Sequence, residues 1–525
     1  MSDRTAADIA LINPRFEASY WGLERALPLF GKRTAMPVAS LPLLAALTPP
    51  EHRVRIFDEN VEPLDFAQIA RADIVGLTGM SVQRTRMREI LVELQRRQAF
   101  TIVGGPWVSV HERYFGDLTH TIFVGEAEET WPQFLEDWRR GTPRDRYEQA
   151  MRTDMTRVPV PRYDLLEMGR YLFGSIQFSR GCPFQCEFCD IIVTFGRRPR
   201  LKTAAQIVRE LDALRAHGME IVFIVDDNLI GNKRAVTPLL ETLQAWQEAH
   251  GFPFVFVTEA SLDLAEDPAL MRLMIDANIL SVFIGIESPN EASLVETRKH
   301  QNVKIGRTLV DRVHAVQHAG LEVWSGMILG FDHDDETIFS AQREFLRDAR
   351  IAQAMIGMLY AIPKTPLHAR LAASGRLDPD DDSPFGTNVL PARLSREALR
   401  DGYVRLMEDV YHPDAYFERL AGGLGNGAFP SAPARARYWR RHPLARLKGQ
   451  AYNLARAAAL FARLMRRVED PDLRARYRRE VARQMRARRD PGHLFAYLIR
   501  CALHYHHYTF AQEMARHQRP VINSF

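Results

Sequence analysis

The stretch SRGCPFQCEFCD, residues 179–190, decides how the rest of the chain is interpreted. It places Cys182, Cys186 and Cys189 within eight residues, in a chain of 525 residues with four cysteines. Three and then two residues separate them, whereas a structural zinc ribbon needs two separated CxxC pairs and four ligands. Three such thiolates suit three irons of a [4Fe–4S] cubane. We therefore predict a cluster whose fourth iron, free of protein ligands, is a place for chemistry.

The cysteines follow an apolar run, and five more apolar runs come after them, each separated by a helical stretch. This alternation predicts six β/α units, a partial or full barrel with its active site at the carboxyl ends of the strands. The runs cover residues 175–180, 220–228, 253–261, 281–288, 322–331 and 352–363. Polar residues gather at their ends: Asp226, Asp227, Asn228, Glu259, Ser261, Glu287 and Ser288.

The residues before the barrel also alternate between short apolar runs and amphipathic stretches. The runs are residues 9–14, 54–60, 73–81, 100–106 and 120–126, and they predict an open, doubly wound parallel sheet. Such sheets bind ligands at the carboxyl ends of their strands, where glycine lets a large flat ligand approach the backbone. The predicted binding residues are Gly79, Ser81, Gly104, Gly105, Gly125 and Glu126. The alternative, that these glycines simply end strands, stays open.

These patterns divide the chain into an α/β part and a helical part. We expect a Rossmann-like sheet domain over residues 1–150, a linker over 151–172, a barrel over 173–374 and a helical domain over 375–525. The linker contains RVPVPRYDLL, residues 157–166, which indicates an extended crossing segment.

Cysteine usage and the absence of apolar segments bear on location. The fourth cysteine, Cys501, lies far from the other three, so a disulfide framework is not expected and a reducing compartment is favoured. The N-terminus lacks the pattern of a signal peptide, and no run of about eighteen apolar residues predicts a membrane span. We expect a cytoplasmic protein.

The motifs together resemble the cobalamin-binding branch of the radical S-adenosylmethionine (SAM) enzymes. The resemblance covers the sheet domain, the barrel and the tail, and the branch includes methyltransferases acting on hopanoid lipids and bacteriochlorophyll-type tetrapyrroles. It rests on SRGCPFQCEFCDI, GRRPRLK (196–202), VDDNLIGNK (225–233), GIESP (285–289) and PKTPL (363–367). It implies a [4Fe–4S] cluster, SAM and cobalamin as cofactors.

The resemblance also implies roles for residues of the barrel. Glu259, Glu287 and Ser288 lie where the ribose and amino group of SAM are held, although strand ends are often polar simply because they meet solvent. The segment 326–337, which includes Ile328, matches the segment that lines the adenine. Phe184 and Phe188 are expected to pack around the cluster, and Asp226, Asp227 or Asn228 to contact SAM or substrate.

Cobalamin is expected to bind without a histidine from the protein. The chain lacks the DxHxxG motif whose histidine ligates cobalt in many cobalamin domains. His52 and His120 are the nearby candidates on strand flanks, and an isolated histidine is more often a surface or capping group.

The tail offers two further patterns. HYHHY, residues 504–508, could be taken for a metal site, but its spacing favours a solvated helical stretch. Arginine-rich helices over residues 435–489 contain Leu454, Ala457, Ala458, Phe461, Leu464 and Met465 at helical spacing. They predict either a helix packed on the barrel with a basic outer face or peripheral contact with a membrane.

We interpret the chain as a cobalamin-dependent radical SAM methyltransferase. By resemblance, it methylates an unactivated carbon of a small-molecule, lipid or tetrapyrrole substrate through a 5′-deoxyadenosyl radical and methylcobalamin, with an external electron donor such as flavodoxin or ferredoxin and no nucleic-acid partner. Three alternatives stay open. They are a cyclase or ring-rearranging enzyme on the same scaffold, a SAM- or cobalamin-sensing binding protein, and a radical SAM enzyme without cobalamin.

Overall fold

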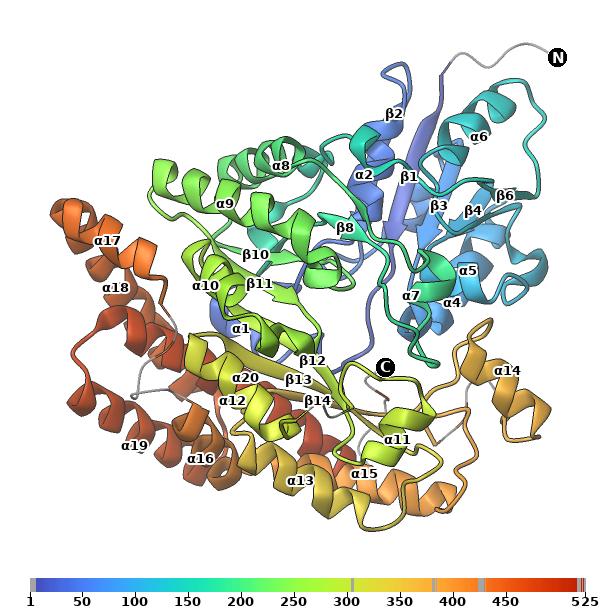
Figure 1. The fold of residues 1–525 in the computed structure, drawn as a ribbon. Coiled ribbons are helices and arrows are strands. Elements are labelled where there is room, and N and C mark those ends of the chain that lie inside the picture. The colour runs from blue at the N-terminus through green and yellow to red at the C-terminus, as the bar shows by residue number, and fades with distance from the viewer. Residues whose placement is uncertain are drawn as a thin grey trace.

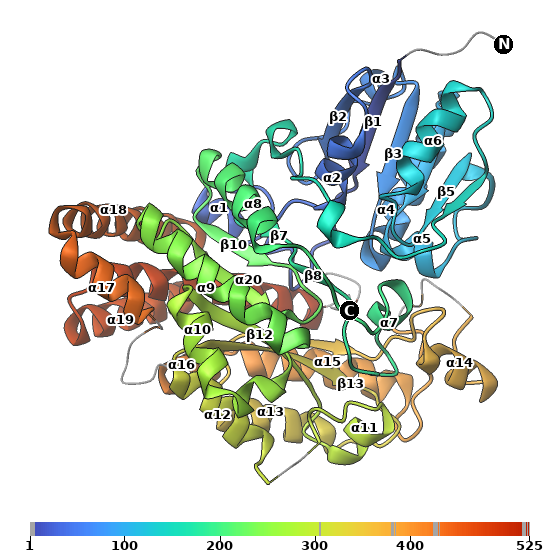
Figure 2. The ribbon, with the colours of Figure 1, turned by 45° about the horizontal axis from the view of Figure 1, so that its top comes forward.

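The computed structural model describes residues 6–303, 306–379, 383, 385–423, 429, 431–516, 521 and 523. An N-terminal sheet domain stands over a central barrel, and helices of the C-terminal region lie beside the barrel and across it (Figures 1 and 2). The α/β class, with parallel sheets and a helical C-terminal region, is as predicted.

The N-terminal domain is a parallel sheet of six strands in the order β2-β1-β3-β4-β5-β6. From β1 the chain first adds β2 on one side and then adds β3 to β6 on the other side, which is the topology of a doubly wound fold. The strands are β1 (Asp8–Asn13), β2 (Arg53–Asp58), β3 (Ile74–Thr78), β4 (Thr101–Gly104), β5 (Thr121–Val124) and β6 (Arg146–Glu148). Five were predicted, and β6, with three residues, was not.

Helices cover both faces of this sheet because alternate strand residues point to opposite sides. In β1, Ala10 and Ile12 join the core beneath α4, whereas Ile9 and Leu11 join the core beneath α2 and α6. The helices are α2 (Ser40–Leu47), α3 (Phe66–Ile69), α4 (Arg84–Arg96), α5 (Pro106–Val110) and α6 (Thr130–Arg139).

The central domain is a second parallel sheet of six strands, curved into an open barrel with the order β14-β13-β12-β11-β10-β7. All six predicted strands are present. They are β7 (Gly174–Ile176), β10 (Ile221–Ile224), β11 (Val255–Glu259), β12 (Ile279–Glu287), β13 (Glu322–Leu329) and β14 (Ala354–Met358). The intervening helices are α8 (Ala204–Ala216), α9 (Lys233–His250), α10 (Pro268–Asp276), α11 (Glu291–Glu296), α12 (Leu309–Ala319) and α13 (Ile338–Asp348).

Each barrel strand has an outer face against helices and an inner face toward the barrel axis. In β10, Val222 and Ile224 belong to the main core with α8 and α9. Phe223, between them, belongs to a separate inner cluster with Val257 of β11 and Leu503 of the tail. The continuous apolar runs recognised in the sequence therefore reflect strands buried on both faces.

The C-terminal region consists of helices, as predicted. They are α14 (Pro366–Ala373), α15 (Arg396–Tyr411), α16 (Pro413–Gly423), α17 (Pro433–Arg441), α18 (Pro443–Arg467), α19 (Pro471–Ala487) and α20 (Pro491–Ala515). Helix α20 is the centre of this region, since α15, α18 and α19 all pack against it.

The interpretation of HYHHY as a solvated stretch is wrong. His504, His506 and His507 lie on α20 and are at most 2% exposed. His504 bonds through Nδ1 to the hydroxyl of Tyr477 at 2.7 Å and through Nε2 to the carbonyl of Tyr411 at 3.0 Å. His504 therefore joins α20 to α15 and α19 in the core of the tail.

The packed face of α18 also differs from the one expected. Ala457, Leu460 and Leu464 are buried, whereas Leu454 is 53% exposed. The buried stripe therefore lies along one side of the helix, and Leu454 belongs to the outer side.

The connection between β1 and β2 leaves the sheet domain and reaches the barrel and the tail. Its short helix α1 (Leu27–Phe30) contacts α18. Trp21 packs against Phe283 of β12 with ring centroids 5.3 Å apart, and Tyr20 stacks on His507 of α20 at 4.2 Å. Residues 14–52, which we call the β1–β2 connection, thus join all three parts of the molecule.

Charged pairs hold the sheet domain to the entrance of the barrel at two places. On one side, Arg180 bonds to Glu126 at 2.8 Å and to Glu128 at 2.6 Å, and Arg200 bonds to Glu126 at 2.9 Å. On the other side, Lys364 of the PKTPL motif bonds to Glu112 at 2.6 Å.

Replacing Glu126 with alanine should lower the free energy of unfolding by about 2–3 kcal/mol. The variant leaves two arginines less well neutralised, one of them buried, although Glu128 still compensates Arg180. Urea denaturation of the variant and the wild-type protein measures the difference.

The matched control is Glu148→Ala, which removes an exposed partner of Arg146. We expect it to change the free energy of unfolding by less than about 1 kcal/mol. Equal effects of the two substitutions would contradict a special role for the pairs of Glu126.

Candidate active site

The three cysteines lie on one loop between β8 (Ser179–Arg180) and α7 (Ile191–Thr194). β8 pairs antiparallel with β9 (Arg200–Leu201), which closes the base of the loop. Gly181 turns the chain with φ of +101°, a conformation that favours glycine, and the amide of Cys182 donates to the carbonyl of Gly196 at 3.2 Å. Cys186 is buried, and Cys182 and Cys189 are half-buried.

The geometry of the loop is compatible with the predicted cluster. All three thiols are free, and burial raises the pKa of Cys182 and, more strongly, of Cys189. Among the described residues, no group of three or more His, Cys, Asp or Glu side chains converges to hold one metal ion. Thiolates of a cubane each bind a different iron, so they are not expected to converge on one point.

Two carboxylates at the end of β10 hold the backbone that enters the loop. Asp226 accepts hydrogen bonds from the amides of Phe178 and Ser179 at 2.7 and 2.8 Å and from the Ser179 hydroxyl at 2.6 Å. Asp227 accepts from the amide of Gly181 at 2.7 Å. Burial raises the pKa of Asp226 to about 7 and that of Asp227 to about 6.

These bonds assign Asp226 a positioning role in the structure, since both of its oxygens are engaged by the loop. Its predicted contact with a cofactor stays a prediction. The third polar residue of this strand end, Asn228, bonds to Ser261 through its amide nitrogen at 3.0 Å, which ties the ends of β10 and β11 together.

Residues 297–302, which follow α11, approach the cluster loop from the other side. The amide of Glu187 donates to the carbonyl of Thr297 at 2.9 Å, and the side-chain amide of Gln301 lies 3.4 Å from the sulfur of Cys186. Lys299 bonds to Glu287 at 2.7 Å. Sequence reasoning missed this segment, because a polar stretch after a short helix looks like an ordinary loop.

Lys299 is a cation buried beside the cluster loop and the end of β12. It is 9% exposed, and its ammonium lies 5.9 Å from the ring centroid of Phe188. Burial lowers the pKa of Lys299, but the negative charges of Glu287 and of the Cys186 thiolate raise it by more, so the net shift is upward. Lys299 is therefore charged where an anionic group of a ligand could approach.

The remaining predicted barrel residues lie around this centre. Glu287 has φ of +68°, at a register shift that ends β12, and Ser288 is fully buried. Ile328 of β13 and Phe188 belong to one hydrophobic cluster, and Phe188 contacts Phe331 with ring centroids 6.2 Å apart. The aromatic residue between the first two cysteines, Phe184, is half-buried.

An ion-pair network supports the cluster loop from outside the barrel. Arg370 of α14 bonds to Glu187 at 2.8 Å, to Asp332 at 2.5 Å and to Glu296 at 3.1 Å. Glu187 lies between two of the cysteines, so these bonds fix the loop to α14 and to the end of β13.

The predicted residues of the sheet domain form the carboxyl edge of β3, β4 and β5. Gly105 has φ of +96°, and Gly125 faces open space, since a methyl group placed on it would meet no atom within 4 Å. All six line one cavity: Gly79, Ser81, Gly104, Gly105, Gly125 and Glu126. An edge of bare backbone facing a cavity suits a large flat ligand such as cobalamin.

The two histidines considered as cobalt ligands lie at the opposite edge of the sheet. His52 accepts from the amide of Ala7, before β1, at 3.0 Å. His120 accepts from the amide of Thr101, at the start of β4, at 3.1 Å. Both rings therefore cap the amino ends of strands and do not reach the glycine edge.

The cavity joins the sheet domain to the barrel. Its volume is about 1870 Å³, above the roughly 300–1,000 Å³ of an ordinary small-molecule site, so it has room for more than one molecule. Asp227 and Glu259, at the ends of β10 and β11, line it together with the glycine edge. The cysteines, Glu287, Ser288 and Ile328 are not among its lining residues. The Asp227–Gly181 hydrogen bond links the wall of the cavity to the cluster loop.

Glu259, on the wall of this cavity, has a carboxyl group whose pKa is strongly raised. Burial, together with the nearby Asp227 and Asp226 carboxylates, raises the pKa of Glu259 to about 8. A strongly shifted carboxyl in a cleft is typical of a binding or catalytic site.

None of the helices in the described part of the chain is both long enough and apolar enough to cross a membrane.

Comparison with family models identifies two regions. Residues 176–343 match the radical SAM superfamily, and residues 365–519 match a domain of unknown function, DUF4070.

Two curated relatives cover most of the chain. An uncharacterised methyltransferase of Synechocystis is 40% identical over 415 residues, 78% of this chain and 77% of its own. A hopanoid C-2 methylase of Rhodopseudomonas palustris is 35% identical over 445 residues, 83% of each chain. Among solved structures, the cobalamin-dependent SAM radical enzyme OxsB matches with a TM-score of 0.60 at 15% identity, covering 98% of this chain and 80% of its own.

The raised pKa of Glu259 predicts a pH-dependent stability in the protein without SAM. Between pH 4.5 and about 8 the folded state keeps a proton that the unfolded chain has lost. The free energy of unfolding therefore falls as pH rises through this window, by up to about 1.4 kcal/mol per pH unit from this group. Glu259→Gln should remove that contribution, so its stability relative to wild type should increase from pH 5 to pH 8.

Urea denaturation at several pH values measures the difference. Glu248→Gln, at an exposed glutamate of α9, is the control and should leave the pH profile unchanged. Parallel profiles for Glu259→Gln and wild type would show that the carboxyl ionises normally in the folded protein.

Proposed function

We propose that this chain methylates a carbon of an apolar small molecule. The chain belongs to the radical SAM superfamily and to its cobalamin-dependent methyltransferases. The observation that carries the proposal is the single cavity shared by the glycine edge of the sheet domain and the strand ends of the barrel. Methyl transfer requires the donor, the radical and the substrate to meet. The proposal is supported by the position of Glu259 and Asp227, which line this cavity while Asp227 is also hydrogen-bonded to the cluster loop.

The three cofactors would be held by different parts of the chain. We assign the [4Fe–4S] cluster to Cys182, Cys186 and Cys189, and SAM to the region of Glu259, Glu287, Ser288 and Ile328. Cobalamin would lie on the glycine edge. When bound, the cluster and SAM supply a radical that abstracts hydrogen from the substrate, and cobalamin supplies the methyl group.

The residues of the chain bind, orient and shield these groups. Asp226 and Asp227 fix the start of the cluster loop, and Arg370 fixes its middle through Glu187. Lys299 would place a buried cation near the carboxylate of SAM, which would share it with Glu287. The pairs of Glu126 and Lys364 link the sheet domain to the barrel, which would limit the access of water to the space between them.

An external electron donor would approach the exposed side of the cluster loop. Gln185 is exposed between two of the cysteines, and the neighbouring Arg197 and Arg198 are also exposed. This cationic surface suits an acidic carrier such as flavodoxin or ferredoxin. For domain organisation, we keep the predicted boundaries near residues 150, 172 and 374.

Helix α18 supports contact with an anionic membrane. Leu444, Leu447 and Leu454 are 77%, 64% and 53% exposed and share one side of the helix. Exposed Arg446 and Lys448 accompany them. Exposed leucines bordered by cations are typical of helices that lie in the membrane interface. Such contact would bring the enzyme to a substrate dissolved in lipid.

Removing the cluster ligands should abolish activity. We expect Cys182→Ala, Cys186→Ala and Cys189→Ala to lose the iron, about four per chain in the wild type, and to form no 5′-deoxyadenosine from SAM under reducing anaerobic conditions. Cys501→Ala, in the core of α20, is the matched control and should keep both. Iron analysis and chromatography of the products provide the measurements.

A product that gains one methylene unit in the wild-type reaction supports methyl transfer. Formation of 5′-deoxyadenosine with a product lacking that unit would instead point to a cyclase or ring-rearranging enzyme.

The membrane contact is tested with Leu444, Leu447 and Leu454 replaced together by glutamine. Co-sedimentation with vesicles rich in phosphatidylserine should fall at least about fivefold, because the buried apolar area is lost. Met485→Gln, at an exposed apolar residue of α19, is the control. Unchanged sedimentation of the triple variant would remove α18 as the contact.

A further inference from the structure

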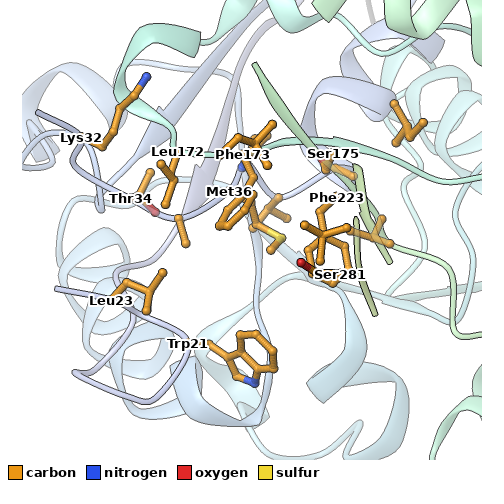
Figure 3. Close-up of a pocket in the computed structure, with 18 of the residues that line it drawn as sticks. Trp21, Leu23, Lys32, Thr34, Met36, Leu172, Phe173, Ser175, Phe223 and Ser281 are labelled. Carbon is orange, nitrogen blue, oxygen red and sulfur yellow. The ribbon is translucent and has the colours of Figure 1, made fainter. Parts of the chain in front are cut away.

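The cavity extends below the strand ends into the barrel itself. Its inner wall consists of apolar side chains from three barrel segments, Phe173, Phe223 and Val257. Figure 3 shows Phe173 and Phe223 beside this space, with Met36 close to them. This inner part is separate from the glycine edge assigned to cobalamin, although both line one cavity.

Two segments far from the barrel in sequence complete the wall. The β1–β2 connection contributes Trp21, Leu23 and Met36 from the sheet domain (Figure 3). Helix α20 contributes Ile499 and Leu503 from the tail. Leu23 and Leu503 belong to the same hydrophobic cluster as Phe223, so the three parts of the molecule form one continuous apolar surface.

Two polar groups on this apolar wall lack partners among the described residues. Ser175 of β7 is 1% exposed, and its hydroxyl makes no hydrogen bond. The indole nitrogen of Trp324 on β13 is also buried without a partner. Both residues line the cavity. A buried donor without an acceptor costs free energy, which a ligand with a suitably placed oxygen would recover.

Two cations that line the cavity are already paired with carboxylates, Arg500 with Glu322 and Arg456 with Glu220. Lys32 donates at 2.9 Å to the carbonyl of Gly169, which carries no charge. A carboxylate placed among the apolar side chains inside the barrel would therefore compete with an existing ion pair or remain uncompensated, which is unfavourable in an apolar site. Near Lys32, by contrast, it would meet a cation that forms no ion pair with a carboxylate of the described residues.

We infer that this inner part of the cavity is the substrate site, and that it takes a largely apolar, neutral molecule with an oxygen that accepts a hydrogen bond from Trp324 or from Ser175. The inference rests on the proposed function, since it names the substrate class of the same cavity. It makes Trp324 and Ser175 specificity-determining residues, and it makes the β1–β2 connection and α20 the walls that select shape.

Binding of three probes to the cofactor-loaded protein tests the inference without turnover. The probes are tritiated cholesterol as a neutral polycyclic alcohol, cholesteryl sulfate as its charged counterpart, and protoporphyrin IX as a flat dicarboxylic acid. Without SAM or reductant, we expect saturable cholesterol binding, at least tenfold weaker binding of the sulfate, and no displacement of cholesterol by protoporphyrin.

Variants locate the binding site. Trp324→Phe keeps an aromatic ring but loses the N–H, and Ser175→Ala loses the hydroxyl. The variant that removes the donor used by the cholesterol hydroxyl should weaken binding roughly five- to tenfold. Met36→Glu places a charge at a half-buried position of the wall and should weaken it at least tenfold. Met485→Gln on α19 is the control, and thermal unfolding verifies that each variant is folded.

Three results would overturn the inference: no saturable cholesterol binding, tight displacement by protoporphyrin, or unchanged affinity in all three cavity variants. Formation of 5′-deoxyadenosine from SAM tests the proposed function separately. A protein that forms this product but fails the binding test would lose the assigned substrate class and keep the proposed chemistry.

Discussion

The hydrogen bonds from Asp226 and Asp227 to the backbone before Cys182 are the constraint on which the rest of the structure depends. The cluster loop contains little regular structure, so it needs rigid neighbours to fix its thiols. Adjacent carboxylates at the end of β10 supply them, because Asp226 bonds to Ser179 at the start of β8 and Asp227 bonds to the turn at Gly181. The adjoining β11 carries Glu259, and the wall of the cavity begins there.

Local sequence patterns were enough to predict most of the strands and the main candidate site residues. The twelve main strands of the two parallel sheets, apart from β6, were recognisable because strands buried on both faces leave continuous apolar runs. The cysteines were recognisable by spacing alone. The glycine edge was also recognisable, since Gly104 ends strand β4 and Gly105 directly follows it. Local patterns therefore predicted the fold class, the cluster loop and the glycine edge.

The remainder depended on contacts between distant segments, which leave no local pattern. The segment 297–302 gave no sign that Lys299 and Gln301 reach the cluster loop. His504 and His507 looked solvated because histidine is polar, yet α20 is surrounded by other helices and by the β1–β2 connection. Strand β6 was missed because three residues, two of them charged, carry too little apolar signal.

The β1–β2 connection has a consequence for how such enzymes diversify. It belongs to the sheet domain by sequence but to the barrel wall by position, and α20 closes the same wall from the other end of the chain. Neither segment contains a cysteine of the cluster loop or a glycine of the glycine edge. Lineages can therefore exchange or lengthen these segments and acquire new substrates while the catalytic apparatus is inherited intact.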